Sequence, residues 1–595
     1  MNYENKKQKV IAISSFVSII IGNLVGYFHP AKGYELCMYE ATPFLVWLFF
    51  FIAILGGVII LIFQVKSRLY YKSNFWLIGF IILLICRYSI LYIPYTRGYY
   101  TFYYDHIDHI GMIKDIVSAG EIHITNFYPI THIFLAEIVL ISRLPVLLIS
   151  NHSTAIFSSL FIVSIYLLSK YSMNKDVAIL SVASIGGVIF NGYDFYLMPN
   201  GWSMLYMPLA IFVYLKSLRT FEYKILLVLM LLLYPFFHPF STMMLVFYLS
   251  VIGTVKTFIS IRNNKYKLNV NTFINISVTP ILILVVTSLI WMLNFRAFWP
   301  IIRNLYFAAI TGKSSSVIGG MSDTLQKINL SGIDFLELVI RSEGDILIYL
   351  MITVLSFYIY FKNTKKYNMS TSFLVIFSMI FATSFFYASY LFNIIPGLQN
   401  INAGRILAFM SLFVGIPVAY FFKYMIEQRK STMTFLCIII ILITSIISVF
   451  GVLPSPLVIR PSLQVSQMDV DSSAWIINYK NTSIESVYIQ TSPLYKIADL
   501  TIGYAEKMNR TDLGNVYSQI PDHFNYSHYS GFGYSYNEDK YSLIHKMDEM
   551  AYSTVWEAVG RFNENDFKII EHDKTVDKLY SNNECSVFYI HSVAL

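Results

Sequence analysis

The sequence predicts an α-helical polytopic membrane protein that ends in a soluble domain of α/β or α+β type. Of its 595 residues, 56% are hydrophobic and only 13% are charged, which is too apolar for a water-soluble globule. The apolar residues also occur in runs of about twenty, the length of a membrane-spanning helix. These runs stop near Pro454. We therefore predict a transmembrane domain over residues 1–453 and a soluble domain over residues 454–595.

Counting the apolar runs gives about thirteen predicted crossings. The first run follows Lys9 and lacks a small-residue cleavage site, so we interpret it as an uncleaved anchor. The piece from His132 to Leu148 is broken by Arg143 and Pro145, and we expect it to dip into the membrane and return. The crossings are predicted near residues 10–28, 41–63, 75–94, 149–169, 175–191, 201–215, 223–237, 240–256, 271–292, 346–361, 371–391, 404–422 and 432–452.

Basic loops predict the orientation, because short loops rich in lysine and arginine stay in the cytoplasm. Such residues precede the first run, follow the second, and recur after four later runs. This pattern predicts a cytoplasmic N-terminus, outer loops at residues 95–131 and 293–345, and an extracytoplasmic soluble domain. The basic residues are Lys6, Lys7, Lys9, Lys66, Arg68, Lys72, Lys216, Arg219, Lys224, Lys256, Arg262, Lys265, Lys267, Lys362, Lys365, Lys366, Lys423, Arg429 and Lys430.

The region after residue 454 has the short patterns of a folded aqueous domain. Residues 486–491 and 585–590 are short alternating or apolar pieces that predict strands. The stretch that begins at Tyr541 has apolar residues at helical spacing and predicts a helix. About 140 residues suffice for a modest core.

Several functional classes are not supported by the sequence. There is no Walker loop, no GxGxxG fingerprint and no nucleophile elbow, so ATP-driven chemistry by this chain alone is not expected. The net charge of +8 arises in the loops predicted to be cytoplasmic, and no nucleic-acid partner is expected. Four cysteines without CxxC spacing support neither a disulfide framework nor a thiolate metal site. They are Cys37, Cys86, Cys437 and Cys585.

A polar island interrupts the apolar sequence at residues 103–134. Residues 105–109 read DHIDH, which concentrates aspartate and histidine in a chain of low overall charge. A helix over 105–118 would place Ile107, Ile110, Ile113 and Val117 on one face and three aspartates roughly opposite. We expect this helix to lie at the membrane interface with its carboxylates toward water. A functional island and an ordinary solvated amphipathic loop remain equal alternatives on this pattern alone.

The order of these features resembles the GT-C superfamily of multi-pass glycosyltransferases, in particular archaeal and bacterial members with a soluble domain after the last span. The resemblance rests on a D-x-x-x-H motif in the first long outer loop, a YP-x-x-H motif after it, a histidine between two spans and an arginine at the mouth of a late span. No WWDYG-like motif occurs in the tail, which argues against transfer to asparagine sequons. The matching residues are Asp105, His109, Tyr128, Pro129, His132, His238 and Arg405.

The resemblance implies a membrane glycosyltransferase of the hexosyltransferase class in a prokaryotic plasma membrane. Such enzymes take a sugar from a polyprenyl phosphate or diphosphate and pass it to a glycan, lipid or protein acceptor on the outer side. The resemblance implies a catalytic role for Asp105, as base or metal ligand, and for His109. Where a divalent metal is required, it would be Mg or Mn. A deprotonated carboxylate can take the proton of an acceptor hydroxyl.

The departing phosphate needs cations, and five basic residues are predicted at the outer face: Arg296, Arg303, Lys313, Arg341 and Arg405. We favour Arg405 and then Arg303 for the donor phosphate; the alternative for both is anchoring to lipid headgroups. Asp108, Asp194, His132 and His238 are candidates for an acceptor or metal site. For Asp194 the alternative is a solvated turn residue, and for His238 it is a hydrogen-bonded histidine at a helix end.

Two other functions stay open on the sequence. One is a transporter or flippase of a lipid-linked glycan or small solute, although no internal repeat is evident and charge within the spans is scarce, with Arg87 the clearest case. Transporters usually show an internal repeat and charged residues within their spans. The other is a non-catalytic surface-assembly protein, which would leave the island without a role.

Overall fold

A computed structural model describes residues 2–102, 105–263, 278–296, 298–311, 332–362, 371–394, 403–428, 430–489, 493–514 and 518–593. Within these ranges, nine helices are long and apolar enough to cross a membrane by length and composition. The chain is therefore a multi-pass membrane protein. The nine helices are α1 (Asn2–Tyr27), α3 (Phe44–Lys66), α4 (Trp76–Thr96), α7 (Val146–Ser172), α11 (Pro239–Asn263), α16 (Gly332–Lys362), α17 (Thr371–Leu391), α18 (Ala403–Glu427) and α19 (Ser431–Val452).

Helices also occupy most of the described residues in the other four predicted crossings, but these helices are shorter or more polar. They are α8 (Lys175–Ile185), α9 (Pro199–Ser217), α10 (Phe221–Leu233) and α13 (Thr279–Met292). At 1.5 Å per residue, α8 and α10, with 11 and 13 residues, reach only about 17–20 Å, short of the ~30 Å hydrocarbon core. Length and hydropathy therefore support nine full spans among the described helices, where the runs alone predicted about thirteen.

The core of the bundle is formed by helices that are apolar on every side. Every residue of α8 from Val177 to Ile185 is buried, and most of α18 is buried as well. α8 packs against α3, α7 and α18, while α16 packs against α18 and α19. Burial on all faces explains why the sequence of α8 shows no amphipathic stripe.

The tail folds around a four-stranded sheet with the order β3-β4-β6-β5. β3 (Ser486–Val487) pairs in parallel with β4 (Lys540–His545), whereas β6 (Cys585–Ile590) is antiparallel to both β4 and β5 (Val576–Ser581). Strand β6 confirms the predicted piece 585–590, whereas β3 covers only Ser486–Val487 of the predicted piece 486–491, and residues 490–491 lie outside the described ranges. The accompanying helices are α20 (Gln467–Tyr479), α21 (Pro493–Thr501), α22 (Tyr504–Asn509), α23 (Lys546–Met550) and α24 (Glu564–Ile570).

The helix predicted from Tyr541 is wrong over its first turn. Residues Tyr541 to His545 belong to β4, all of them are buried, and α-helix is found only from Lys546 to Met550. Because consecutive residues of β4 are buried, both faces of this strand are covered, and its sequence has no period-two pattern. Tertiary packing therefore overrode the helical spacing.

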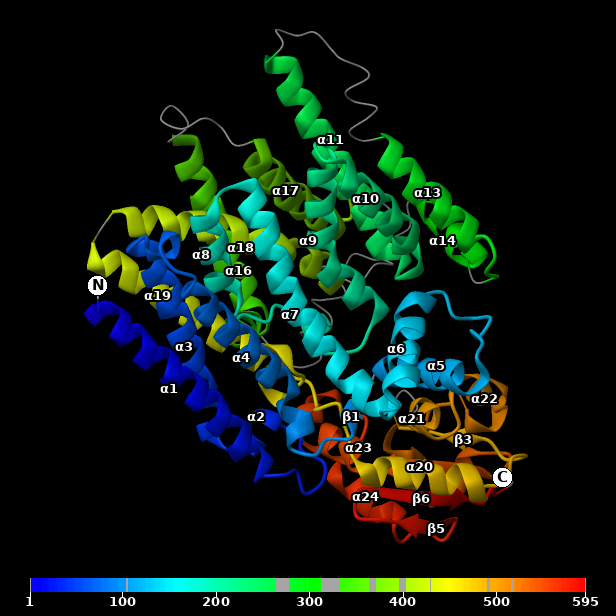
Figure 1. Cartoon of the computed structure of the whole chain (residues 1–595). Helices are drawn as coiled ribbons and strands as arrows, with labels where there is room; N and C mark the ends of the chain where they lie inside the picture. The colour runs from blue at the N-terminus through cyan, green and yellow to red at the C-terminus, as the bar shows by residue number, and fades with distance from the viewer. Residues whose placement is uncertain are drawn as a thin grey trace.

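Two short helices lie between the long helices and the tail, as Figure 1 shows for α5 (Asp105–Ala119) and α6 (Pro129–Ser142). α6 is too short to cross a membrane and ends at Arg143 in the left-handed region, in line with the predicted break. Just before α5, β1 (Thr101–Phe102) pairs antiparallel with β2 (Gln464–Val465) at the start of the tail. This pairing joins the tail to the polar island.

Candidate active site

The predicted helix of the polar island is present as α5, with its apolar face as expected. Ile107, Ile110 and Ile113 are all buried. They belong to one cluster with Leu135 of α6 and Ile497 of α21. The prediction that this face lies on the membrane interface is wrong, because protein side chains from α6 and the tail cover it.

Two of the three carboxylates on the acidic face of α5, those of Asp108 and Asp115, contact the tail, contrary to the prediction that they point to water. Asp108 pairs with Lys496 and, at 3.1 Å, with Lys507. Asp115 accepts a hydrogen bond from the backbone N–H of Ala505 at 2.7 Å. Burial raises the pKa of Asp108, but hydrogen bonding to Asp499 and the charges of the two lysines outweigh this and lower it to about 2. The tail thus binds α5 through charge.

Asp105 is the carboxylate of α5 that stays accessible. It lies at the first position of the helix, and its side chain is 56% exposed. The Nζ atom of Lys496 lies 3.3 Å from its Oδ1 atom. Asp105 therefore combines an open carboxylate with a neighbouring cation, and Lys496 was not predicted. Lys496 is one of several basic residues in the tail, and nothing in the sequence distinguishes it.

A buried chain of hydrogen-bonded side chains includes His109, which lies one turn after Asp105 in α5. The side-chain amide of Asn126 contacts His132 Nδ1 at 2.9 Å, and His132 Nε2 contacts His109 Nδ1 at 3.0 Å. Since Asn126 Oδ1 accepts from the N–H of Tyr128, its NH₂ group faces His132. His132 then accepts at Nδ1 and donates from Nε2, which leaves His109 with its proton on Nε2.

The histidines of α5 are neutral at physiological pH. Burial lowers the pKa of His109 to about 3, although the charge of Asp108 acts in the opposite direction. Burial likewise lowers the pKa of His106 to about 4. His106 accepts from the N–H of Leu197 at 2.8 Å, so it holds α5 against the loop before α9. His109, one turn after Asp105 in α5, is therefore a hydrogen-bond donor and not a charged group.

His238 and Arg405 also lie near Tyr128. The rings of Tyr128 and His238 stack with centroids 5.0 Å apart, and Arg405 is half-buried in the first turn of α18. Burial raises the pKa of Tyr128; Asp105 raises it further and Arg405 lowers it, so both charges lie near this phenol. Burial and then Arg405 lower the pKa of His238 to about 3. The structure thus brings Asp105, His109, Tyr128, His238 and Arg405 together.

Two predicted residues lie apart from this group. Asp194 is buried and forms a 2.6 Å ion pair with Arg87, with side-chain exposures of 3% and 0%; it also accepts from Ser158. This carboxylate holds helices together and is neither solvated nor open to a ligand. Arg303 is exposed on α14 (Phe298–Thr311). Lys313 lies outside the described residues.

The island does not fit a divalent cation in this structure. Oxygen ligands from several carboxylates suit Mg or Mn, but Lys496 and Lys507 neutralise Asp105 and Asp108, and His109 and His132 bind each other. Within the described part of the chain, a group that could bind a metal occurs in the tail instead. It consists of Asp469, His545 and Cys585.

Solved structures show which fold this is. The Archaeoglobus fulgidus oligosaccharyltransferase in complex with Zn and sulfate matches with a TM-score of 0.51 and 12% identity, over 86% of this chain and 73% of that one. AglB from the same organism, with an inhibitory peptide and a dolichol-phosphate, matches with a TM-score of 0.50 and 11% identity, over 86% and 74%. The fold is that of the GT-C glycosyltransferases.

ArnT from Cupriavidus metallidurans bound to undecaprenyl phosphate gives a TM-score of 0.47 at 10% identity, over 87% of this chain and 98% of that one. No protein-family model matches the sequence, and no curated protein matches it. The fold is therefore assigned from its likeness to the two oligosaccharyltransferase structures and not from sequence similarity.

Proposed function

We propose that this chain transfers a sugar from a polyprenyl-phosphate-linked donor to an acceptor hydroxyl on the outer side of the membrane. The observation that carries the proposal is the exposed carboxylate of Asp105, which has the Nζ atom of Lys496 at 3.3 Å, in a GT-C fold. Arg405 lies near the neighbouring Tyr128. AglB, which shares this fold, is seen with a dolichol-phosphate. The absence of a WWDYG-like motif favours an acceptor other than an asparagine sequon.

The residues suit a direct displacement. Asp105 takes the proton of the acceptor hydroxyl as its oxygen forms a bond to the anomeric carbon. The bond from that carbon to the phosphate oxygen breaks, and its electron pair leaves with the polyprenyl phosphate. Arg405 and Lys496 are the cations that can stabilise the departing phosphate, and His109 offers an N–H from Nε2 beside the carboxylate. Each step uses only side chains of this chain.

The site also needs a particular orientation. A polyprenyl donor presented from the outer leaflet requires α5, Arg405 and the tail on the same outer side. We therefore propose that the N-terminus is cytoplasmic and that residues 454–595 form an extracytoplasmic domain, as the basic loops predict.

The test is sugar transfer by the purified protein in detergent, with a panel of polyprenyl-phosphate sugars. Asp105→Asn should lower the rate by about 10²–10⁴, the usual loss for a general base. Asp115→Asn is the matched control on the same helix, since an amide oxygen can still accept from Ala505 N–H. Solute flux in vesicles without transfer would support the carrier, and normal turnover of Asp105→Asn would refute the assigned role.

A further inference from the structure

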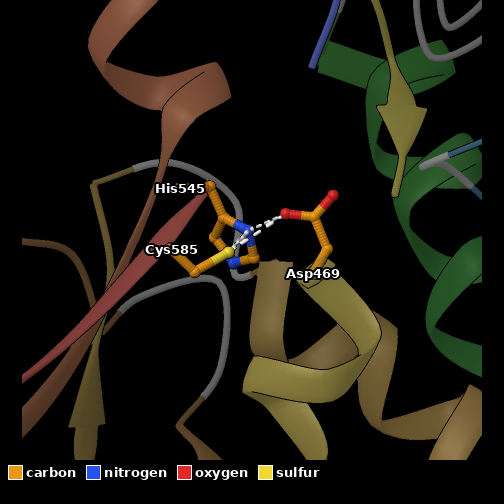
Figure 2. A group of neighbouring side chains, drawn as sticks. All are labelled: Asp469, His545 and Cys585. Atoms are coloured by element: carbon orange, nitrogen blue, oxygen red, sulfur yellow. Dashed lines mark hydrogen bonds and ion pairs between the residues drawn. The ribbon is translucent and has the colours of Figure 1, made fainter. Parts of the chain in front are cut away.

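The tail contains a buried group of three side chains of three chemical types, drawn in Figure 2. Asp469 lies in the first turn of α20. His545 ends β4 and Cys585 begins β6, and these two residues are direct partners in the antiparallel register. All three are buried, at 6%, 3% and 2% exposure. Segments far apart in the sequence thus deliver one oxygen, one nitrogen and one sulfur to the same place.

The three atoms converge on one point. Asp469 Oδ1 lies 2.8 Å from His545 Nδ1 and 3.1 Å from Cys585 Sγ, and the sulfur lies 3.2 Å from the same nitrogen. Around a tetrahedral zinc ion such ligand atoms are ~3.3–3.5 Å apart, given bonds of 2.0–2.3 Å. An ion would therefore need the three atoms to separate by only a few tenths of an ångström.

This geometry is not that of a nucleophilic triad. In a triad, the nucleophile and the carboxylate bind opposite nitrogens of the imidazole. Here Cys585 and Asp469 both approach Nδ1 of His545, so the histidine cannot relay a proton between them. The arrangement suits a common binding partner at the centre of the three atoms.

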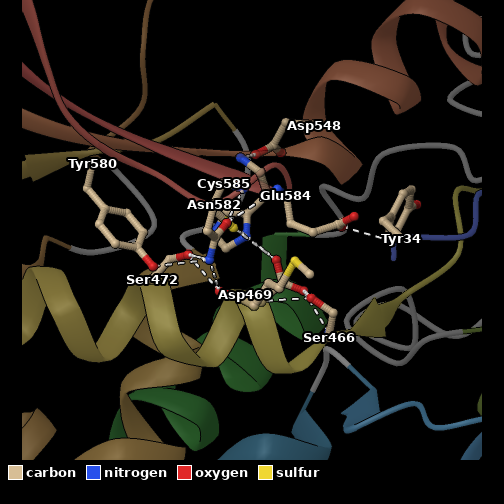
Figure 3. A network of polar contacts seen from close by, with 11 residues as sticks. Tyr34, Ser466, Asp469, Ser472, Asp548, Tyr580, Asn582, Glu584 and Cys585 are labelled. Atoms are coloured by element: carbon tan, nitrogen blue, oxygen red, sulfur yellow. Dashed lines mark hydrogen bonds and ion pairs between the residues drawn. The ribbon is translucent and has the colours of Figure 1, made fainter. Parts of the chain in front are cut away.

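The second layer of contacts orients the carboxylate of Asp469 as metal ligands usually are oriented, whereas Nε2 of His545 has no hydrogen-bond partner among the described residues. The second carboxylate oxygen of Asp469 accepts from the N–H and the hydroxyl of Ser466, at 2.7 and 2.9 Å, which leaves Oδ1 for the centre. Figure 3 shows Asp548 and Glu584 beside the group. Asp548 is fully buried, and its Oδ1 atom has no hydrogen-bond partner among the described residues.

The charges around this group call for a cation. Three carboxylates (Asp469, Asp548 and Glu584) surround a single histidine, and within the described ranges none of them forms an ion pair with lysine or arginine. The three ligands alone, a thiolate from Cys585, the carboxylate of Asp469 and a neutral imidazole from His545, carry two negative charges, which a divalent ion cancels. A neutral cluster is far cheaper to bury than an unpaired charge.

We propose that Asp469, His545 and Cys585 bind one zinc ion. Sulfur and imidazole ligands favour zinc over magnesium or calcium, which prefer oxygen alone. His545, Cys585 and Glu584 line a cavity of about 380 Å³, from which water can fill the fourth position. The ion would fasten α20 to the β4–β6 pair, next to Glu584, which accepts from the N–H of Tyr34 at 2.9 Å. This proposal does not depend on the transferase function.

The test uses the full chain purified in detergent with an affinity tag that lacks histidine. After zinc loading and exhaustive dialysis, elemental analysis should give one zinc per chain, and Cys585→Ser should lower this at least tenfold. Cys437→Ser is the matched control, because Cys437 is also buried and lies in α19. Zinc retained by Cys585→Ser at the wild-type level would overturn the proposal, as would no zinc in the wild type.

A second measurement covers the case in which Cys585→Ser fails to fold. Wild-type protein stripped of metal and titrated with Co²⁺ should develop a thiolate-to-cobalt absorption band that saturates at one equivalent. Added Zn²⁺ should then remove the band. A titration without that band would show that Cys585 does not ligate a metal, whatever the variants do.

Discussion

Replacing Lys507 with methionine should loosen the contact between the tail and α5 more than any exposed lysine change. The side chain of Lys507 is 2% exposed, and its ammonium binds Asp499 at 2.6 Å and Asp108 at 3.1 Å. Lys507→Met keeps most of the apolar stem but leaves two carboxylates without that cation. Breaking a buried pair by removing one partner costs about 3–5 kcal/mol.

That cost predicts a measurable change in local opening. Hydrogen exchange over residues 493–514 should speed up by roughly 10²–10⁴ in Lys507→Met, since each 1.36 kcal/mol is a factor of ten. Lys578→Met is the control, because Lys578 pairs with Glu571 at 2.8 Å with side-chain exposures of 36% and 40%, and such surface pairs contribute at most about 1 kcal/mol. Adding Asp499→Asn to Lys507→Met should restore part of the protection.

The reasoning would be refuted if Lys507→Met changed exchange in 493–514 no more than Lys578→Met does. It would also fail if exchange rose equally in the membrane helices, because that would indicate global destabilisation. In either case the buried charges would not be what attaches the tail to α5.

Three further predictions follow from the same contacts. Arg405→Ala should raise KM for the polyprenyl donor at least tenfold, whereas Arg303→Ala, on an exposed helix, should change it less than twofold. The pKa of Asp108 is lowered from 3.8 to about 2, so the contribution of its carboxylate to stability should be complete above pH ~4 and lost as the pH falls toward 2. Hydrogen exchange over residues 493–514 measured against pH should show this dependence, and Asp108→Asn should remove it. Ser530→Cys should react with an impermeant maleimide on intact cells and Lys72→Cys should not; the reverse pattern would invert the proposed orientation.

The polar island shows how far a periodic pattern predicts structure. The spacing of Ile107, Ile110 and Ile113 predicted both the helix and its buried face, because a 3.6-residue period is a local property. It could not predict what covers that face. Whether an acidic stripe meets water or two lysines almost four hundred residues away depends on tertiary contacts, and Lys496 and Lys507 carry no local signal.

Predictions for single residues were less consistently correct than predictions from a periodic pattern. Asp194 was a candidate for an acceptor or metal site, with a solvated turn residue as the alternative, yet it is buried against Arg87, and only the fold reveals such a pair. The metal-capable group was missed because Asp469, His545 and Cys585 have no ligand spacing and meet only when β4 pairs with β6. The roles of Asp105, His109 and Arg405 stay predictions, although the structure gathers these residues around Tyr128.

The attachment of α5 to the tail also sets an order of events during synthesis. Lys496 follows Asp105 by 391 residues, so at translation rates of about 5–20 residues per second it is made roughly 20–80 s later. Until then the acidic face of α5 has no lysine partners from the tail, and β1 has no β2 to pair with. A nascent chain would therefore carry an unfinished site through most of its membrane insertion. The proposed site could be completed only after the segment of the tail that carries Lys496 has been made.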